Sequence, residues 1–271
     1  MMSDPNLNKD VLVGLLRPEM ITGLERFNST FLSAENTNVN EYRQQRCLPP
    51  FVIDHKNHTL GFSPSLYSLH QSSLHQRNKV MEMALDYLRS VEAWIPALSK
   101  WRNEKFPIYG TSSSLLLSIE RAASYTFGIR QYAVYINGYI TVPKIRTTSS
   151  SSNHSASDSN REIKIWVAQR SLTKETWAGY LDQMVAGGIA TNHGLSQTVI
   201  KECQEEAGIP PRLARFAKPV SSIQYFTESR LGLQPETLFT YDLEMPADFV
   251  PMPNDGEVES FYLWSIEKVS I

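Results

Sequence analysis

The stretch from Met184 to Pro210 constrains this chain more than any other part, and it reads MVAGGIATNHGLSQTVIKECQEEAGIP. It consists of a Gly-Gly turn, a polar loop, a segment rich in glutamate and a Gly-Ile-Pro stop. Ser196 suits the N-cap of a helix, and Gly208 suits the left-handed residue that follows one. Because two prolines then prevent continuation, the stretch predicts a short helix over residues 197–207.

This predicted helix gathers three carboxylates, because Glu202, Glu205 and Glu206 stand at positions i, i+3 and i+4. Beside them runs an apolar stripe made of Val199, Ile200, Cys203 and Ala207. Like charges at this spacing destabilise a helix, so a cation is expected to compensate them. Mg²⁺ takes oxygen ligands and retains some of its water, which suits a carboxylate cluster that binds a diphosphate. The alternative is a solvated helix face, which is common for runs of Lys and Glu.

The whole stretch resembles the Nudix box, whose pattern is Gly, five residues, Glu, seven residues and then Arg-Glu-aliphatic-any-Glu-Glu-any-Gly-aliphatic. The positions in register are Gly187, Lys201, Glu202, Cys203, Glu205, Glu206, Gly208 and Ile209. Two positions depart, since His193 stands in place of the first Glu and Lys201 replaces the Arg. Lysine keeps the positive charge but lacks the guanidinium fork that holds carboxylates in a bidentate pair. His193 removes one potential metal ligand or base.

The resemblance implies an α+β protein with the Nudix α/β/α sandwich, a mixed sheet and a catalytic loop-helix-loop. It also implies a pyrophosphatase that uses Mg²⁺ or Mn²⁺ to hydrolyse the diphosphate bond of a small molecule. Glu202 and Glu205 are the expected catalytic residues, with Glu202 the first choice for the general base. The expected metal ligands are the Gly187 carbonyl and the carboxylates of Glu202, Glu205 and Glu206.

Auxiliary roles in substrate binding or catalysis are expected for four further residues, His193, Lys201, Glu257 and Glu259. Glu257 and Glu259 lie two apart in the run Asp-Gly-Glu-Val-Glu, so they point to the same side of an extended segment. Either could reach the metal cluster or a substrate water. An alternative interpretation, which the sequence favours equally, is that both glutamates are charges on an edge strand that discourage aggregation.

A second segment points to a narrower relative. Residues Ser171 to Trp177, SLTKETW, and the run from Leu181 to Gly187, LDQMVAG, resemble the lead into the box of Nudix proteins related to thiamine pyrophosphokinase. In that group the box follows an N-terminal domain of unassigned function. This resemblance implies hydrolysis of thiamine diphosphate, or of its oxo and oxy forms, to the monophosphate. A nucleoside diphosphate derivative such as ADP-ribose, or a Nudix-fold binding protein without activity, remains as an alternative.

The sequence predicts two domains, an N-terminal α+β domain over residues 1–125 and the Nudix domain over residues 126–271. In the first, helices are predicted over 12–16, 20–31, 73–94 and 115–123, and strands over 51–54 and 59–62. In the second, a hairpin is predicted over 132–142 with its turn at Asn137-Gly138. Further strands are expected over 163–168, 217–226 and 237–243, with a helical turn over 265–269. The Ser-rich residues 146–161 predict a disordered loop.

Composition excludes several functional classes. Among 271 residues the net charge is −2, which gives no basic surface for nucleic acid. No run of eighteen apolar residues is present, so no membrane-spanning helix is expected. The acidic start of the chain lacks the apolar core of a secretory signal and the arginine-rich pattern of a transit peptide, which predicts a cytoplasmic protein. Two cysteines are too few for a disulfide framework, and the oligomeric state is left open.

Overall fold

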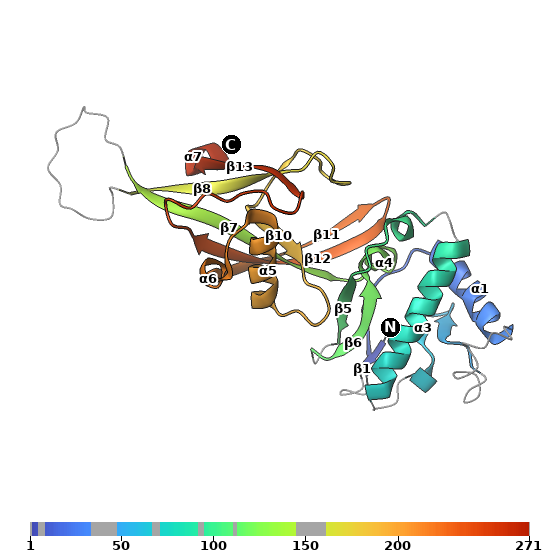
Figure 1. Cartoon of the computed structure of the whole chain (residues 1–271). Helices are drawn as coiled ribbons and strands as arrows, with labels where there is room; N and C mark the ends of the chain where they lie inside the picture. The colour runs from blue at the N-terminus through green and yellow to red at the C-terminus, as the bar shows by residue number, and fades with distance from the viewer. Residues whose placement is uncertain are drawn as a thin grey trace. The chain divides into compact units, whose positions relative to one another are not determined.

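The computed structural model describes residues 2–4, 9–33, 48–66, 71–91, 95–110, 113–144 and 161–270 (Figure 1). The chain divides into two compact units, each of which we describe by itself. Unit 1 comprises residues 1–131, 190–192 and 224–236, and unit 2 comprises residues 132–189, 193–223 and 237–271. The predicted disordered loop over 146–161 lies, except for its last residue, outside the described residues.

Unit 1 combines helices with short antiparallel strand pairs. Its helical segments are α1 (Glu19–Ser33), η1 (Pro64–Leu66), α3 (Gln71–Val91), η2 (Pro96–Lys100) and α4 (Arg121–Thr126). Its strand pairs are β1 (Met2–Asp4) with β2 (Lys9–Val11), β3 (Phe51–Asp54) with β4 (Thr59–Phe62), and β5 (Lys105–Tyr109) with β6 (Leu115–Glu120). The strands predicted over 51–54 and 59–62 are thereby confirmed. The helix predicted over 73–94 is confirmed as far as Val91, and residues 92–94 lie outside the described part of the chain.

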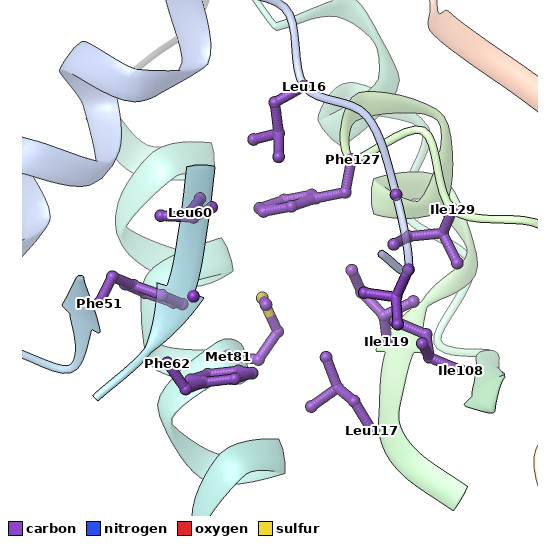
Figure 2. A pocket seen from close by; sticks show the side chains of 13 residues that line it. Leu16, Phe51, Leu60, Phe62, Met81, Ile108, Leu117, Ile119, Phe127 and Ile129 are labelled. Carbon is purple, nitrogen blue, oxygen red and sulfur yellow. The ribbon is translucent and has the colours of Figure 1, made fainter. Parts of the chain in front are cut away.

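Helical spacing explains how α1 joins the core of unit 1. Met20, Leu24, Phe27 and Phe31 recur along one face of α1, and all four side chains are buried. Val80, Ala84 and Leu88 form the matching buried face of α3. Between the elements lies an apolar cavity of about 50 Å³, which Figure 2 shows ringed by aromatic and aliphatic side chains such as Phe62, Leu117 and Phe127.

Two helix predictions in unit 1 were wrong. Residues 12–16 are not helical, and the helix predicted over 115–123 is strand β6 followed by α4. Ile119 pairs with Phe106, and Leu117 pairs with Ile108, so cross-strand contacts between buried side chains decide the conformation of this apolar run. The chain turns into α4 at Glu120, whose side chain caps the helix by accepting from the Ala122 N–H.

Unit 2 is built on a large sheet with the strand order β11-β12-β7-β8-β13, in which β10 also pairs with β7 and β9 with β8. The strands are β7 (Gln131–Pro143), β8 (Arg161–Arg170), β9 (Leu181–Asp182), β10 (Val185–Gly188), β11 (Lys218–Ser229), β12 (Gly232–Glu244) and β13 (Val258–Ser265). The helices are α5 (Leu195–Ala207), α6 (Pro211–Ala214) and α7 (Ile266–Val269). Strand β8 runs antiparallel to β7, β9 and β13. The predicted α+β class is confirmed.

The hairpin predicted at Asn137-Gly138 was wrong, because β7 runs through both residues without a turn. The Asn137 side chain donates to Asp242 Oδ1 at 3.1 Å instead of shaping a turn. Gly138 pairs with Trp166 of β8, and a side chain at Gly138 would place its Cβ 2.1 Å from Met184 Sδ. This glycine therefore serves close packing in a sheet interior rather than a turn.

No helix among the described residues is both long and apolar enough to cross a membrane.

Candidate active site

Helix α5 carries the predicted carboxylates, and local chemistry fixes both of its ends. It begins two residues earlier than predicted, since Gly194 rather than Ser196 is the N-cap. The Gln197 side chain accepts from the Gly194 N–H at 2.9 Å, which satisfies a donor at the helix start. At the other end Gly208 adopts φ 64°, as predicted, and the Ile209 N–H donates to the Cys203 carbonyl at 2.9 Å.

The apolar face of α5 determines where its carboxylates lie. Val199, Cys203 and Ala207 are buried in the core of unit 2, and this places the side of the helix that carries Glu202 and Glu206 against β10. Glu206 Oε2 accepts from the Ala186 N–H at 2.9 Å. This hydrogen bond joins the carboxylate of Glu206 on α5 directly to the backbone of strand β10.

Gly187 leaves the space that the Glu202 carboxylate occupies. A side chain at Gly187 would place its Cβ 2.2 Å from both Cγ and Cδ of Glu202 and 2.5 Å from Oε2. No side chain larger than hydrogen fits there without moving Glu202. The glycine of the predicted box is therefore required for close approach of a carboxylate to β10, rather than for an unusual backbone angle.

Burial makes the charged forms of these carboxylates unfavourable. Glu206 is 7% exposed, and burial raises its pKa to about 8, although the bond from the Ala186 N–H acts in the opposite direction. The charges of Glu257, Glu202 and Asp255 raise the same pKa further. Burial also raises the pKa of Glu202, against the lowering effect of Lys201. The site has an excess of negative charge that a cation would relieve.

Lys201 neutralises part of this charge. Its Nζ donates to Glu202 Oε1 at 3.0 Å and to Glu205 Oε2 at 2.6 Å, so one ammonium group bridges two carboxylates. Burial lowers the pKa of Lys201, but the hydrogen bonds and charges of Glu205 and Glu202 outweigh it and the pKa is raised. Glu205 lies on the more exposed side of the helix, with its side chain 49% exposed. Lys201 thus makes one hydrogen bond to each of two glutamates, without the bidentate fork of arginine.

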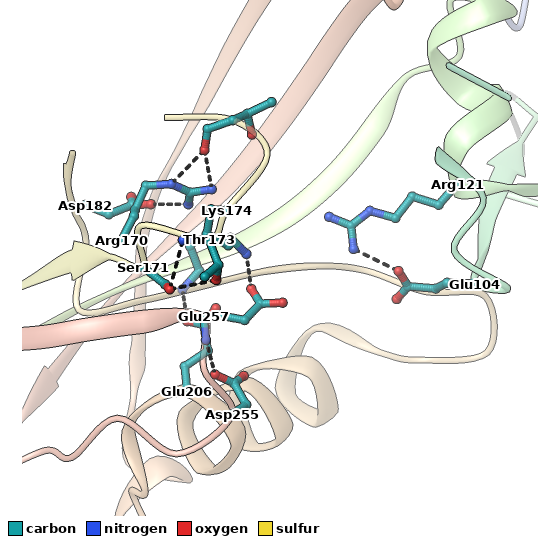
Figure 3. A network of polar contacts seen from close by, with 12 residues as sticks. Glu104, Arg121, Arg170, Ser171, Thr173, Lys174, Asp182, Glu206, Asp255 and Glu257 are labelled. Atoms are coloured by element: carbon teal, nitrogen blue, oxygen red, sulfur yellow. Dashed lines mark hydrogen bonds and ion pairs between the residues drawn. The ribbon is translucent and has the colours of Figure 1, made fainter. Parts of the chain in front are cut away.

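Glu257 joins the site from the segment before β13. Its N–H donates to Asp255 Oδ1 at 2.9 Å, and its carbonyl accepts from the Ser171 N–H at 2.9 Å. Its carboxylate pairs with Lys174, a contact visible in Figure 3. Since the charge of Glu257 acts on the pKa values of both Glu202 and Glu206, this side chain belongs to the same electrostatic neighbourhood.

The remaining sequence candidates are placed differently. His193 is exposed in the loop before α5. Glu259 is also exposed, and it lies at a bulge in β13 between Val258 and Ser260, where the register with β8 shifts. Sequence reasoning missed the Ala186 N–H, Lys174 and Asp255. The last two stand in segments that the sequence singled out, but a backbone donor leaves no signal in a sequence.

The donor set suits a hard divalent cation. Among the described residues no group of three or more His, Cys, Asp or Glu side chains is arranged to enclose a metal ion. Glu202 and Glu206 nevertheless present oxygen ligands in a buried place where their negative charge is otherwise unfavourable. Glu205 would complete the set after its release from Lys201. These residues therefore fit Mg²⁺ or Mn²⁺, with Glu202 and Glu206 as the buried part of the site.

Comparison with known protein families gives one match in each half of the chain. Residues 156–270 match the family described as NUDIX domain. These residues form a Nudix domain. Residues 4–131 match a second family, described as domain of unknown function DUF4743. The predicted Nudix fold is thus confirmed, and the Nudix domain contains Gly187 and all of α5.

The chain is also similar to proteins with and without a functional name. The chain is 30% identical over 230 residues to an uncharacterised protein of Saccharomyces cerevisiae, covering 80% of this chain and 60% of that one. It is 37% identical over 170 residues to Nudix hydrolase 24, chloroplastic, of Arabidopsis thaliana, covering 62% of this chain and 42% of the relative. The chain therefore spans about 40 to 60% of the length of these relatives.

Solved structures with similarity to the chain include DR0079 of Deinococcus radiodurans, with a TM-score of 0.40 and 14% identity, covering 61% of this chain and 86% of that one. Another is the NUDIX domain of Shewanella oneidensis NrtR in complex with ADP ribose, with a TM-score of 0.38 and 14% identity, covering 53% of this chain and 78% of that one.

The raised pKa of Glu206 predicts how the stability of the metal-free protein depends on pH. Between pH about 4.5 and about 8 the folded protein holds a proton on Glu206 that the unfolded chain has released. The free energy of unfolding therefore falls as pH rises through this window, by up to about 1.4 kcal/mol per pH unit. Glu206→Gln, which has no such proton, is expected to show a flatter dependence. Urea unfolding in EDTA at several pH values measures both slopes, and equal slopes would contradict the prediction.

Proposed function

We propose that the Nudix domain hydrolyses the diphosphate bond of a small molecule in the presence of Mg²⁺ or Mn²⁺. The observation that carries this proposal is a pair of carboxylates held against β10, Glu206 buried and Glu202 partly buried, where a cation would stabilise their charged forms. The name Nudix hydrolase, given to Arabidopsis relatives that are 37% and 38% identical, supports the same reaction class.

The chain's own residues divide the work as follows. Glu206, Glu202 and Glu205, with the Gly187 carbonyl, would hold the cation, and Lys201 orients Glu202 and Glu205. A bound divalent cation supplies positive charge to the diphosphate oxygens and lowers the pKa of a nearby water. Glu202 accepts a proton from the attacking water while the oxygen of that water bonds to phosphorus. The bridging P–O bond breaks, and the other phosphate leaves with the bridging oxygen.

The auxiliary groups complete the proposed site. Glu257 adds negative charge near Glu202 and Glu206, while Lys174 keeps it in place. The exposed side chains of His193 and Glu259 are assigned to contacts with substrate or its water. In this proposal the chemistry resides in residues 126–271, and residues 1–125 form a separate domain that carries none of the reacting groups.

For the substrate we propose thiamine diphosphate or its oxo and oxy forms, which would give the monophosphate and phosphate. The support is the resemblance of residues 171–187 to Nudix proteins related to thiamine pyrophosphokinase, together with an N-terminal domain of unassigned function ahead of the box. The proposed carboxylate site alone does not select among diphosphates, because it would act on the diphosphate group that all of them share.

A substrate panel tests this proposal. Product release from thiamine diphosphate, its oxo form and ADP-ribose is measured with Mg²⁺, with Mn²⁺ and in EDTA. We expect release of phosphate and monophosphate from the thiamine compounds, which stops when EDTA removes the metal. Release from ADP-ribose alone would keep the reaction class and overturn the substrate. No release from any compound by folded protein would favour a binding protein without activity.

A further inference from the structure

The loop between β8 and β9 exposes large apolar side chains that the proposed chemistry does not use. We name residues 171–181 the aromatic loop. Its exposed fractions are 70% for Leu172, 69% for Trp177, 62% for Tyr180 and 52% for Leu181. Trp177 and Tyr180 are in ring contact, so their exposed faces adjoin. Exposed apolar side chains that adjoin one another are candidates for ligand contact, whereas isolated ones are ordinary.

Hydrogen bonds hold the aromatic loop in one conformation. The Arg170 side chain donates from Nη2 to the Thr176 carbonyl at 3.1 Å and pairs through Nη1 with Asp182 at 2.8 Å. The backbone N–H of Tyr180 donates to the Trp177 carbonyl at 3.2 Å. These bonds tie the aromatic loop to Arg170 at the end of β8 and, through Arg170, to Asp182 of β9.

Trp177 adopts a backbone conformation that bulky residues avoid. Its φ is 56°, in the left-handed region, where a non-glycine residue costs free energy. The bonds from Arg170 and Tyr180 to this turn compensate that cost. The result is an indole that stays exposed at the surface instead of packing into the core.

The contact between the Trp177 and Tyr180 rings leaves part of each ring face accessible to another aromatic ring. The Trp177 and Tyr180 ring centroids are 5.4 Å apart, with an interplanar angle of 75°. In this edge-to-face geometry one ring contributes its edge and the other a single face, so most of both rings remains exposed. An electron-rich indole face attracts planar rings, especially cationic or electron-poor ones.

The base of the aromatic loop is bonded to the catalytic neighbourhood. The Ser171 N–H donates to the Glu257 carbonyl at 2.9 Å, and Lys174 pairs with the Glu257 carboxylate. Figure 3 shows Ser171 and Lys174 on this loop meeting Glu257. The loop that bears Trp177 is therefore attached to Glu257, which is an auxiliary residue of the proposed site.

We propose that Trp177 and Tyr180 form a stacking surface for the aromatic ring attached to the diphosphate of the substrate, and that this ring is a planar, electron-poor or cationic heterocycle. The proposal rests on the proposed function, since it assumes that a diphosphate occupies the site of Glu202 and Glu206. It assigns specificity to the aromatic loop and reaction chemistry to α5. A substrate without a ring then loses the stacking contact but keeps the chemistry.

The test compares a ring-bearing with a ringless substrate in matched variants. Thiamine diphosphate and methyl diphosphate are assayed with the wild type, Trp177→Leu, Trp177→Phe and the control Phe216→Leu, which changes another exposed aromatic residue of unit 2. The left-handed backbone at position 177 costs Leu and Phe a similar free energy, so the two variants differ mainly in the presence of an aromatic ring. We expect Trp177→Leu to raise KM for thiamine diphosphate about 10-fold or more, since base stacking on an aromatic side chain has this magnitude.

The other arms of the test have definite outcomes. Trp177→Phe is expected to recover most of the loss, and none of the variants is expected to change kcat/KM for methyl diphosphate. Equal KM values for thiamine diphosphate in an active wild type and Trp177→Leu would overturn the stacking surface and leave the hydrolase intact. Equal loss on both substrates would also overturn it, because that result indicates a structural role.

A binding measurement separates this proposal from the proposed function. Thiamine monophosphate, which has no diphosphate bond, is titrated while tryptophan fluorescence is recorded. Saturable quenching in the wild type that disappears in Trp177→Leu supports the stacking surface even if no hydrolysis is found. Quenching that is unchanged in Trp177→Leu, or absent from the wild type, would overturn it.

Discussion

Replacement of Glu206 by Gln is expected to lower kcat by about 100-fold or more, with little change in fold. The carboxylate is the buried metal ligand of the proposed site, and its loss removes charge stabilisation of several kcal/mol, where each 1.4 kcal/mol is a factor of ten. The amide oxygen of Gln still accepts from the Ala186 N–H, so the contact between α5 and β10 persists. Steady-state hydrolysis with saturating Mg²⁺ measures the change.

The control for this experiment is Glu244→Gln, at an exposed end of β12 in the same unit. It makes the same chemical change away from the proposed site, and we expect kcat to remain within twofold of the wild type. Calorimetric titration with Mn²⁺ should show weaker binding in Glu206→Gln and unchanged binding in the control. A Glu206→Gln protein that retains wild-type kcat would remove this residue from the mechanism.

Replacement of Gly187 by Ala is expected to lower kcat by about 100-fold through displacement of Glu202 alone. The new Cβ would lie 2.2 Å from the carboxylate carbon, which is closer than any van der Waals contact, so the carboxylate must leave β10. A displacement of about 1 Å at a catalytic group costs about 100-fold in rate. Since Gly187 pairs with buried Val134, the backbone has little freedom to absorb the change instead.

Two further variants show whether the clash is the cause. Gly194→Ala, whose Cβ would meet only Gln197 Oε1 at 3.7 Å, should leave kcat within a few-fold of the wild type. Gly187→Ala should lower the thermal midpoint in the wild-type background but much less in a Glu202→Ala background, where the opposing carboxylate is gone. Equal destabilisation in the two backgrounds would place the damage in the strand rather than at Glu202.

Local signals in the sequence predicted the helix that carries the candidate site. The helix end at Gly208 was correct because a left-handed glycine followed by prolines leaves few other conformations. The apolar stripe of α5 also follows from residue spacing alone. By contrast, the run Leu115 to Ile119 gives no clear period, and only its pairing with β5 makes it a strand. Asn137-Gly138 resembled a turn, whereas packing against Met184 decides that position.

The roles of the individual glutamates could not be read in the same way. Spacing placed Glu202, Glu205 and Glu206 together, but it could not tell that Glu206 is buried and Glu205 exposed. That difference depends on β10, a strand twenty residues away in sequence from the group it binds, as the bond from Ala186 to Glu206 shows. The pair of Lys174 with Glu257 joins residues 83 positions apart, a separation at which a sequence without homologues carries no signal.

The contacts of Lys201 bear on whether the protein folds before or after it binds metal. A cluster of buried acids would normally make metal a condition of folding, as in small domains that collapse only around an ion. Here an ammonium group already bridges Glu202 and Glu205, and Glu206 can hold a proton. If the proposed function holds, the newly made chain can therefore fold first and bind its ion later, so a shortage of metal would leave a folded, inactive protein rather than an unfolded one.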